Sequence, residues 1–272
     1  MEVSKSGYYS WKRRPRSLRS IDNEHLLIEI KRVFWDNDSN YGSPRIYKQL
    51  HNKDHIPCSL NRIARLMQIS DIVAIQKRKF KATTNSKHDY SVWPNILNRN
   101  FIVQKPNSVW VSDITYIWTF EGWLYLAAIL DLYSRGIVGL AMDKTIAETL
   151  TLQALNQAVL RRSPPKGLVY HSDRGSQYAG NDFKALLAKN EFIGSMSKKG
   201  DCWDNAVAES FFHTLKVEFM HRMKFKTREE AKRKIFEYVE TYYNRKRAHS
   251  SLGYMSPLEF ETQAVTSLQT VH

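Results

Sequence analysis

The sequence predicts an α/β protein in which a mixed five-stranded sheet is flanked by helices, with a small helical domain before it and a helical extension after it. Extended apolar segments begin at residue 108 and then alternate with segments of helical spacing. The residues before this region show helical spacing instead. A chain of 272 residues can hold one catalytic domain of about 150 residues and one or two smaller units.

The composition indicates a folded protein with a polyanionic partner. Apolar residues make up 42% of the chain and aromatic residues 12%, which excludes a mainly disordered protein. The 41 Lys and Arg residues against 27 Asp and Glu residues give a net charge of +14. A charge of this size and sign favours nucleic acid as the partner.

The excess positive charge is concentrated in two segments. Residues 1–20, read as a basic N-terminal tail, have a net charge of +5, and residues 74–105 have a net charge of +6. A single cluster of this kind can be solubilising charge alone. Two clusters on either side of a small helical unit favour contacts with DNA phosphates.

Cysteine content and hydropathy bear on the compartment. Cys58 and Cys202 are the only cysteines, and they offer no disulfide framework. No stretch approaches the roughly 18 to 20 apolar residues of a membrane span, and the N-terminus lacks the apolar core of a signal peptide. We expect a cytoplasmic protein without a membrane partner.

Residues 21–82 predict a helical domain of three short helices. The first spans residues 22–36, the second begins with Ser43 as its N-cap, and the third follows Ser59. On the third helix Arg62 and Arg65 are expected to lie outside. Its expected inner face consists of Leu60, Ile63, Leu66 and Met67. Basic residues exposed on the last helix resemble a helix-turn-helix unit that binds DNA, although a purely structural bundle fits the pattern equally well.

A polar segment at 83–103, read as a linker, separates this domain from a catalytic core at 104–222. Extended segments at 109–118, 123–134 and 137–143 are followed in turn by a helix, a strand, a helix, a strand and a long helix. The three later helices are expected at 147–161, at 182–190 and from about residue 205, and the two later strands at 168–172 and 192–196. This order is that of a ribonuclease-H-like fold.

The last 50 residues, 223–272, are expected to form a helical extension. A capping box runs from Thr227 to Glu230, and Ser256–Pro257 marks a further helix start.

Two aspartates occupy unusual places in the predicted sheet. Asp113 lies within an otherwise apolar strand, where an uncompensated charge would cost several kcal/mol, so it must face a cleft, a cation or a hydrogen-bond network. Asp173 ends the fourth strand, and α/β proteins build sites at such ends. If the first and fourth strands are neighbours, the two carboxylates come together. Asp131 and Asp143 are rival candidates, but both are better explained as turn residues.

A third carboxylate, Glu209, lies on the long helix whose start is signalled by Asp204 and Asn205. Glu209, His213 and Lys216 fall on one helical face, beside a packing stripe. The stripe consists of Ala208, Phe212, Leu215 and Phe219. Three carboxylates are oxygen donors that suit Mg²⁺ or Mn²⁺ better than zinc. Two such ions about 3.5 to 4 Å apart can support an in-line phosphoryl transfer.

With these residues in view, the sequence resembles the second-frame proteins of a large family of bacterial insertion sequences, whose transposases belong to the DDE group with a retroviral-integrase-like core. The similar motifs are VSKSGYYSW at 3–11, YGSPRI at 41–46, RIARLM at 62–67, WVSDITYI at 110–117, DLYSRGIVG at 131–139, HSDRGSQY at 171–178, DNAVAESFFHTLKVE at 204–218 and YYNRKRAHSSLGYMSP at 242–257. The 35 residues between Asp173 and Glu209 match the family signature. The resemblance covers nearly the whole chain.

The resemblance implies a transposase whose Asp113, Asp173 and Glu209 bind two Mg²⁺ or Mn²⁺ ions, free a 3′ hydroxyl at the end of the element and join it to target DNA. It implies DNA contacts by Lys216 and a place for Asn205 at the loop before the Glu209 helix. The basic pattern adds Arg62, Arg65, Lys77, Arg78 and Lys79 as candidate DNA contacts. The implied partners are terminal repeats, target DNA, the upstream-frame helix-turn-helix protein, possibly as a fusion, and further copies of the chain on DNA.

Other interpretations remain open at this stage. The chain could be a catalytically silent DNA-binding regulator of transposition, or a nuclease acting on RNA–DNA hybrids. A zinc module of the retroviral integrase type is not expected, because His51, His55 and Cys58 have no fourth partner in the sequence.

Overall fold

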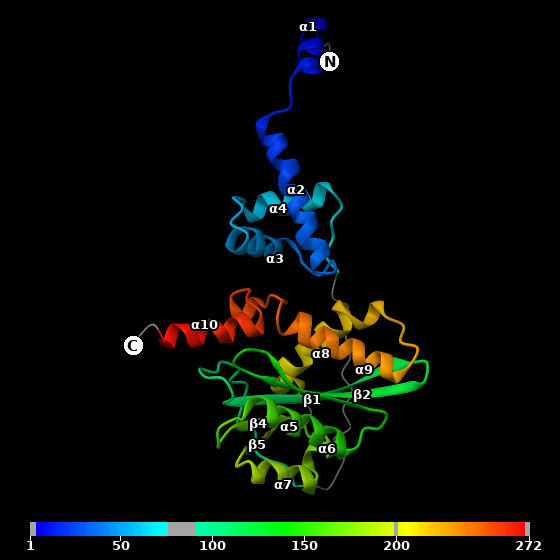
Figure 1. Ribbon diagram of the computed structural model, residues 1–272, viewed down its shortest axis with the longest axis vertical. Coiled ribbons are helices and arrows are strands. Elements are labelled where there is room, and N and C mark those ends of the chain that lie inside the picture. Colours follow the sequence, from blue (N-terminus) through cyan, green and yellow to red (C-terminus); the bar gives the residue numbers. More distant parts are fainter. Residues whose placement is uncertain (1–3, 76–90, 199–200, 270–272) are drawn as a thin grey trace. The chain divides into compact units, whose positions relative to one another are not determined.

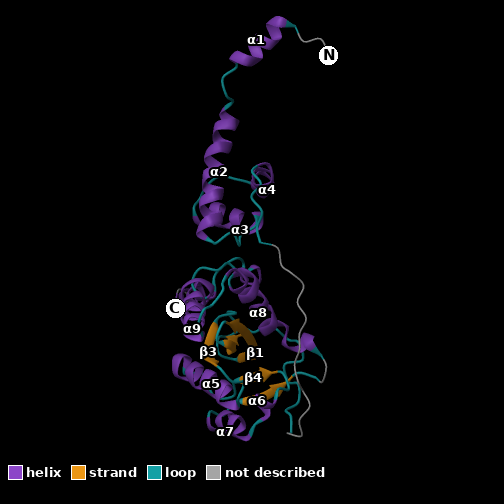
Figure 2. Cartoon of the chain, turned by 90° about the vertical axis from the view of Figure 1, so that its right-hand side faces the viewer, coloured by secondary structure: helices purple, strands orange, loops and turns teal. Residues whose placement is uncertain are grey.

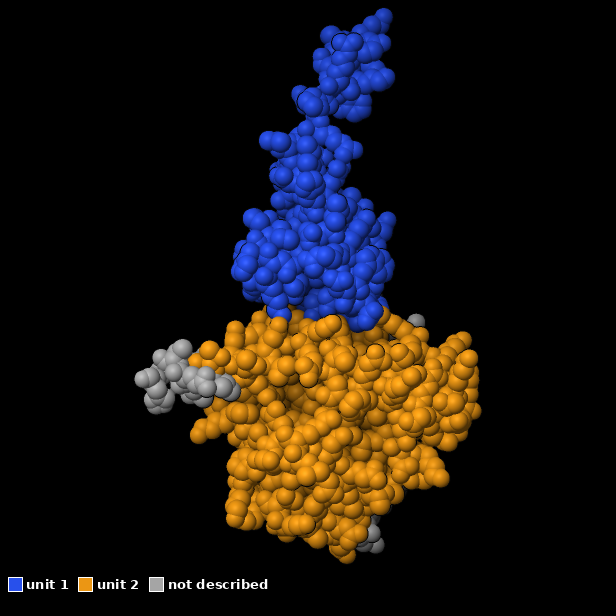
Figure 3. Space-filling model, in the orientation of Figure 1, with its two compact units in different colours: residues 1–76 blue, residues 77–272 orange. Residues whose placement is uncertain are grey.

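The computed structural model describes residues 4–75, 91–198 and 201–269. The chain divides between residues 76 and 77 into two compact units, each with its own core (Figure 3). Within the described residues, no helix combines the length and the apolar character that a membrane crossing needs.

The first unit is helical, as predicted. Its helices are α1 (Lys5–Arg13), α2 (Leu18–Asp36), α3 (Ser43–Lys48), which continues into a π-helical turn (Gln49–Lys53), and α4 (Leu60–Ile69). The buried residues of this unit include Leu26, Ile30, Val33, Ile46, Leu50, Ile63, Leu66 and Met67. Apolar residues of α2, α3 and α4 therefore supply the core.

Helix starts in this unit differ from the prediction in three details. The α2 helix begins at Leu18 and not at residue 22, because the Ser17 hydroxyl caps it by accepting the Ser20 N–H at 3.2 Å. Gly42, and not Ser43, is the N-cap of α3. Leu60 is 41% exposed because it is the first residue of α4, before the helix reaches the core, whereas the predicted Ser59 cap is confirmed.

The second unit contains a mixed sheet of five strands. They are β1 (Val109–Thr119), β2 (Gly122–Asp131), β3 (Ile137–Asp143), β4 (Val169–Ser172) and β5 (Ile193–Met196), in the spatial order β3-β2-β1-β4-β5. The first three strands form an antiparallel meander, and β4 and β5 run parallel to β1. The predicted ribonuclease-H-like order, with the first and fourth strands as neighbours, is confirmed.

Helices cover both faces of this sheet (Figures 1 and 2). On one side lie α5 (Glu148–Arg162), the short α6 (Ser176–Ala179) and α7 (Asn181–Lys189). On the other lie α8 (Ala206–Glu218), entered through a 3₁₀ turn (Cys202–Asn205) and followed by another (Met220–Arg222), and α9 (Arg228–Glu237). Each side has its own hydrophobic core. A Cβ at Gly139 would lie 2.4 Å from the Ala154 carbonyl oxygen, so α5 packs directly on β3.

Part of the segment read as a linker packs against the second unit. Trp93 lies against Gly194 of β5, and the Ser195 hydroxyl accepts the N–H groups of Ile96 at 3.0 Å and Leu97 at 3.3 Å. Leu97 is buried in the core on the α8 side. From Trp93 onward the chain is thus held along β5 and the neighbouring core.

The chain after α8 is helical, as predicted. A π-helical turn (Tyr238–Tyr243) extends α9, and a 3₁₀ turn (Ser250–Leu252) precedes α10 (Pro257–Gln269). The start of α10 carries a reciprocal capping box, because Ser256 Oγ accepts the Glu259 N–H and Glu259 Oε2 accepts the Ser256 N–H. The Asn244 amide accepts the N–H of Ile137 and donates to its carbonyl, so this extension pairs with the outer edge of β3.

Candidate active site

Asp113 and Asp173 lie at matching positions on neighbouring parallel strands. The pairing of β1 with β4 runs from Val109–Val169 to Val111–His171, and each aspartate follows two residues later. Beyond this point β1 pairs only with β2, where Asp113 lies opposite Ala128. Both aspartates therefore lie just beyond the point where β1 and β4 stop pairing.

The third acid approaches from helix α8. Burial raises the pKa of Asp113 well above its usual range, and the charges of Asp173 and Glu209 raise it further. The Ile114 N–H and the Lys216 ammonium act in the opposite direction. The pKa of Glu209 is likewise raised, first by burial and then by Asp173. The fold therefore brings the three acids within electrostatic reach of one another.

Each aspartate has one oxygen engaged by its own backbone. Asp113 Oδ1 accepts the Ile114 N–H at 2.8 Å, and Asp173 Oδ1 accepts the Gly175 N–H at 2.9 Å. Across residues 4–75, 91–198 and 201–269, no three His, Cys, Asp or Glu side chains are gathered closely enough to hold a metal ion. The three acids are an all-oxygen donor set and fit Mg²⁺ or Mn²⁺ chemically.

Lys216 supplies a cation beside these acids. Its side chain is only 7% exposed, and its Nζ lies 5.1 Å from the centroid of the Tyr116 ring. Burial lowers the pKa of Lys216, and the nearby Asp113 carboxylate opposes that shift. The prediction that Lys216 contacts DNA therefore applies only at the site itself, because little of the side chain reaches the outer surface.

Asn205 lies at the start of the Glu209 helix, the place that the resemblance implies. It stands at the N-cap position of α8, but its side chain makes no capping bond. Its Nδ2 instead donates to the Ser112 carbonyl at 3.0 Å, next to Asp113 on β1. Asn205 is only 4% exposed and fixes the start of the Glu209 helix against the sheet.

Asp204 differs from its prediction as a helix-start residue. It is buried and accepts hydrogen bonds from the Lys198 N–H and the Asn95 amide, both at 2.8 Å, and from Arg99 Nε at 2.9 Å. Arg99 also pairs with Asp201. The segment before β1 is thereby tied to the start of α8, a long-range contact that no local pattern signals.

A buried polar cluster under Asp173 was missed by sequence reasoning. His171 Nδ1 lies 2.9 Å from the Ser195 hydroxyl and its Nε2 lies 3.3 Å from the Ser197 hydroxyl. Burial lowers the pKa of His171 to about 4, so the ring is neutral at pH 7. Arg174 Nε donates to the Ser197 carbonyl at 2.7 Å. Both residues fall in the HSDRGSQY motif, so the resemblance could have singled them out.

The rival acids are turn residues, as predicted. Asp131 is fully buried and accepts the N–H groups of Asn107 at 2.7 Å and Tyr133 at 3.0 Å, with Arg162 NH2 at 3.4 Å. Asp143 ends β3 and accepts the Lys144 N–H at 2.5 Å. Neither carboxylate is among the groups that perturb Asp113.

The candidate DNA contacts of the first unit are only partly exposed. Arg62 was expected outside, but it is half-buried and its Nε donates to Asn23 Oδ1 of α2 at 2.8 Å. Arg65 is exposed, as predicted. Lys77, Arg78 and Lys79 lie outside the described residues.

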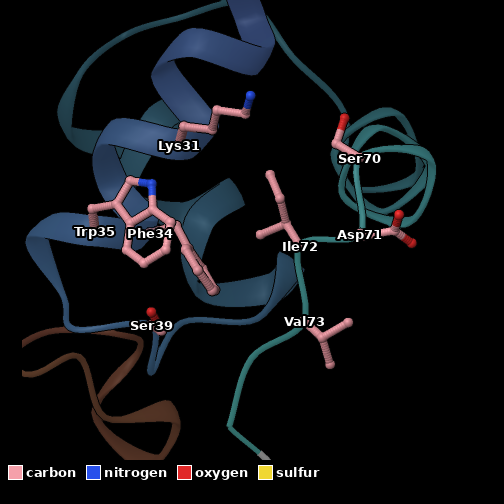
Figure 4. A pocket seen from close by; sticks show the side chains of 8 residues that line it. All are labelled: Lys31, Phe34, Trp35, Ser39, Ser70, Asp71, Ile72 and Val73. Atoms are coloured by element: carbon pink, nitrogen blue, oxygen red, sulfur yellow. The ribbon is translucent and has the colours of Figure 1, made fainter.

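The first unit also has a pocket of about 360 Å³ between α2 and the segment after α4 (Figure 4). It is lined by Lys31, Phe34, Trp35, Ser39, Ser70, Asp71, Ile72 and Val73. None of the predicted site residues lines it.

Comparisons with known proteins match the two units of the chain with separate family models. A model of an HTH-like domain matches residues 21–80, and models of an integrase core domain match residues 103–202 and 209–265. The first core match contains Asp113 and Asp173, and the second begins at Glu209.

Two relatives are similar over nearly their whole length. The chain is 45% identical to the insertion element IS600 uncharacterized 31 kDa protein of Shigella sonnei, over 95% of this chain and 94% of that protein. It is 38% identical to transposase InsF for insertion sequence IS3A of Escherichia coli strain K12, over 97% and 92%.

Solved structures with a similar fold are retroviral integrases. A simian T-cell lymphotropic virus intasome in complex with a PP2A regulatory subunit gives a TM-score of 0.49 at 14% identity, covering 78% of this chain and 73% of that one. The HTLV-2 integrase catalytic core domain in complex with magnesium gives 0.45 at 15% identity, covering 57% and 96%.

Proposed function

This chain belongs to the IS3-family transposases, and from that premise we propose that it cuts and joins DNA strands at the ends of an insertion sequence by metal-dependent transesterification. The observation that carries the proposal is the position of Asp113, Asp173 and Glu209 within electrostatic reach of one another, just beyond the last residue pair of β1 and β4, with Lys216 near Asp113. The raised pKa values of Asp113 and Glu209 mark carboxylates that a cation would stabilise.

The same three acids would hold two Mg²⁺ or Mn²⁺ ions. Ions in such a site lower the pKa of an attacking oxygen and stabilise the leaving 3′ oxygen. Asp113 and Asp173 are fixed by the rigid sheet, whereas Glu209 depends on the placement of α8, which Asn205 and Asp204 secure.

Lys216 would complete the site as a positioned cation. Its ammonium group lies near Asp113 and over the Tyr116 ring, where the protein shields it from water. A partly dehydrated ammonium interacts strongly with a phosphate oxygen. We assign it to the phosphate under attack.

DNA would be recognised by the first unit together with the catalytic unit. The HTH-like domain implies DNA binding, and Arg65 on α4 and the basic residues of α1 are exposed toward solvent. We propose terminal repeats and target DNA as substrates, with the upstream-frame protein, alone or fused, and further copies of this chain as partners on DNA.

A catalytically silent regulator is the alternative of another class. A regulator would also bind DNA through the HTH-like domain, but Asp113, Asp173 and Glu209 would have no catalytic role. The raised pKa values of Asp113 and Glu209 beside Asp173 favour the enzyme, because carboxylates so placed are costly to keep ionised without a cation.

The test is strand transfer with a pre-cleaved oligonucleotide from the end of the element and a plasmid target, in Mg²⁺ or Mn²⁺. Wild type should give joined product, and Asp173→Asn and Glu209→Gln should reduce it by a factor of at least about 10³, as expected when a group needed in the transition state is lost. Asp143→Asn is the matched control and should keep wild-type activity, because Asp143 ends β3 and is not among the groups that perturb Asp113. If only a fusion with the upstream-frame protein gives product, this chain is a catalytic half that needs that protein. DNA binding without product in either form would favour the regulator.

A further inference from the structure

The β1–β2 hairpin carries a cluster of exposed aromatic rings. Tyr116 is 42% exposed, Trp118 is 56% exposed and Trp123 is 44% exposed. Trp118 and Trp123 are direct cross-strand partners, with ring centroids 4.9 Å apart, and Trp123 contacts Tyr116 at 5.1 Å. Both contacts are edge-to-face, so ring surface remains available to a ligand. We call these three residues the hairpin aromatic cluster.

The hydrophobic core does not need these rings. Residues that alternate with them point to the opposite face of the sheet and are fully buried, with Ile117 at 2% and Leu124 at 0% exposure. The hairpin would therefore fold with small polar residues in place of the aromatic cluster. Exposed aromatic patches that the fold does not require mark interaction sites.

The hairpin is held rigidly where it carries the cluster. Phe120 at its turn donates its N–H to the Phe225 carbonyl at 3.1 Å, and Arg228 Nε donates to the Trp123 carbonyl at 2.9 Å. Glu121, the acidic residue of the turn, accepts the Arg228 N–H at 2.8 Å. Figure 1 shows the far ends of β1 and β2 beside the start of α9. A preformed surface loses little entropy when it binds a ligand.

Positive charge lies in the segment that meets the hairpin turn. Residues 219–228, which meet the hairpin turn, contain four basic residues and no acidic one. Three of the four, Arg222, Lys224 and Lys226, are exposed. The cores of interfaces between protein subunits are depleted in charge, whereas surfaces for single-stranded nucleic acid combine cations with aromatic rings.

Lys216 connects the cluster to the acids. Its ammonium group stands over the Tyr116 ring and also interacts with the Asp113 carboxylate. Tyr116 follows Asp113 by three residues, roughly 10 Å along a strand, and the alternation of side chains points it to the opposite face of the sheet. Lys216 interacts with both residues where β1 has no partner other than β2. A DNA strand that has its phosphate at the acids and passes this unpaired edge of β1 would bring neighbouring nucleotides to the cluster.

We propose that the hairpin aromatic cluster stacks against unpaired bases of the DNA strand whose phosphate lies at Asp113, Asp173 and Glu209. The inference rests on the proposed function, because it places DNA at the acids. It adds a base-binding site that separates the strands of the duplex end beside the site of cleavage. Stacking is tolerant of sequence, so this site would bind bases without selecting them.

The test measures binding in the full-length Asp173→Asn chain, so that catalysis is not needed. The probes are a short fully paired duplex and the same duplex with an unpaired 3′ flank that contains 2-aminopurine, whose fluorescence falls on stacking. We expect tighter binding and quenching with the unpaired flank. Trp118→Ala should weaken binding of that probe about 5- to 100-fold and abolish quenching, while binding of the paired duplex stays unchanged. Trp118→Phe should restore most of the loss.

Trp35→Ala is the matched control, since Trp35 is 66% exposed but belongs to the first unit, and it should leave quenching intact. If Trp118→Ala binds the probe with the unpaired flank as tightly as its parent does, the inference is overturned. So would a Trp118→Ala chain that loses only self-association in light scattering, because the cluster would then join two copies of the protein. If the Asp173→Asn chain quenches the probe but the wild-type chain never joins DNA strands, the proposed enzyme is refuted and the base-binding site remains.

Discussion

Asp113 and Asp173 each lie two residues beyond Val111 and His171, the last residue pair that joins β1 to β4. Because the two strands are parallel, both aspartates lie at the same end of the β1–β4 pairing. The backbone pairing alone therefore sets their proximity, and side-chain packing on α8 adds Glu209.

The crowding of these acids predicts that removing one charge stabilises the metal-free protein. Burial and the charge of Asp173 disfavour an ionised Asp113. We expect Asp113→Asn to raise the melting temperature at pH 7 by a few degrees in EDTA, since a gain of 1 kcal/mol raises it by about 2–4 °C in a protein of this size. Differential scanning calorimetry measures it. A lower melting temperature would mean that the Asp113 carboxylate is well solvated or well paired.

Arg247 is predicted to stabilise the fold and not to contact DNA, although it lies in the YNRKRAHSSLGY segment. Its guanidinium forms a buried bidentate ion pair with Glu218 at 2.6 and 2.7 Å. Removing one partner of such a pair costs about 3–5 kcal/mol, so Arg247→Met should lower the free energy of unfolding in urea by that amount. The exposed neighbour Arg245→Ala is the control and should change it by less than about 0.5 kcal/mol. If Arg247→Met and wild type have the same free energy of unfolding, Arg247 does not stabilise the fold.

Asp204 is predicted to hold the start of α8. Asp204→Ala leaves the Lys198 N–H, Asn95 and Arg99 without their acceptor, and should destabilise the protein by about 2 kcal/mol. Strand transfer should fall with it, because Glu209 would lose its fixed position. Asp182→Ala, at an exposed acid on α7, provides the comparison. An active and fully stable Asp204→Ala chain would show that α8 is held by its packing stripe alone.

Asp131 gives a prediction for pH. Burial raises the pKa of Asp131 to about 6, despite two backbone N–H groups and Arg162. Between its ordinary pKa near 4 and pH 6 the folded protein keeps a proton that the unfolded chain has released. Its contribution to stability is therefore greatest at acidic pH and falls as the pH rises through 6. Wild type should lose stability relative to Asp131→Asn over this interval in urea titrations at several pH values. The opposite slope would mean that Arg162 keeps the carboxylate ionised.

Much of this fold follows from local patterns. The strands from Val109 to Asp143 are extended apolar runs that end at glycine or polar turns. Ser59, Thr227 and Ser256 cap helices where their sequence position indicates. The approach of Asp113 to Asp173 required only the assumption that their strands are neighbours, which the strand order confirms.

Contacts between residues distant in sequence could not be predicted in this way. Asn205 and Asp204 look like capping residues, but tertiary partners, the Ser112 carbonyl and Arg99, take their side chains. Arg62 fits the exposed face of α4 by spacing, yet Asn23 of α2 draws it inward. The spacing of residues in a helix predicts the face on which a side chain lies, but it does not predict which distant residue contacts that side chain.

The measurement that tests the central claim most directly is the binding of Mn²⁺ to the full-length protein. Isothermal titration calorimetry and electron paramagnetic resonance would measure this binding without DNA and with a DNA end. If Asp113, Asp173 and Glu209 form one site, wild type should bind two ions with DNA present, and Asp113→Asn and Glu209→Gln should each lose at least one of them. The Asp143→Asn control should keep both. Unchanged Mn²⁺ binding in Asp113→Asn and Glu209→Gln would contradict the assignment of these acids to a metal site.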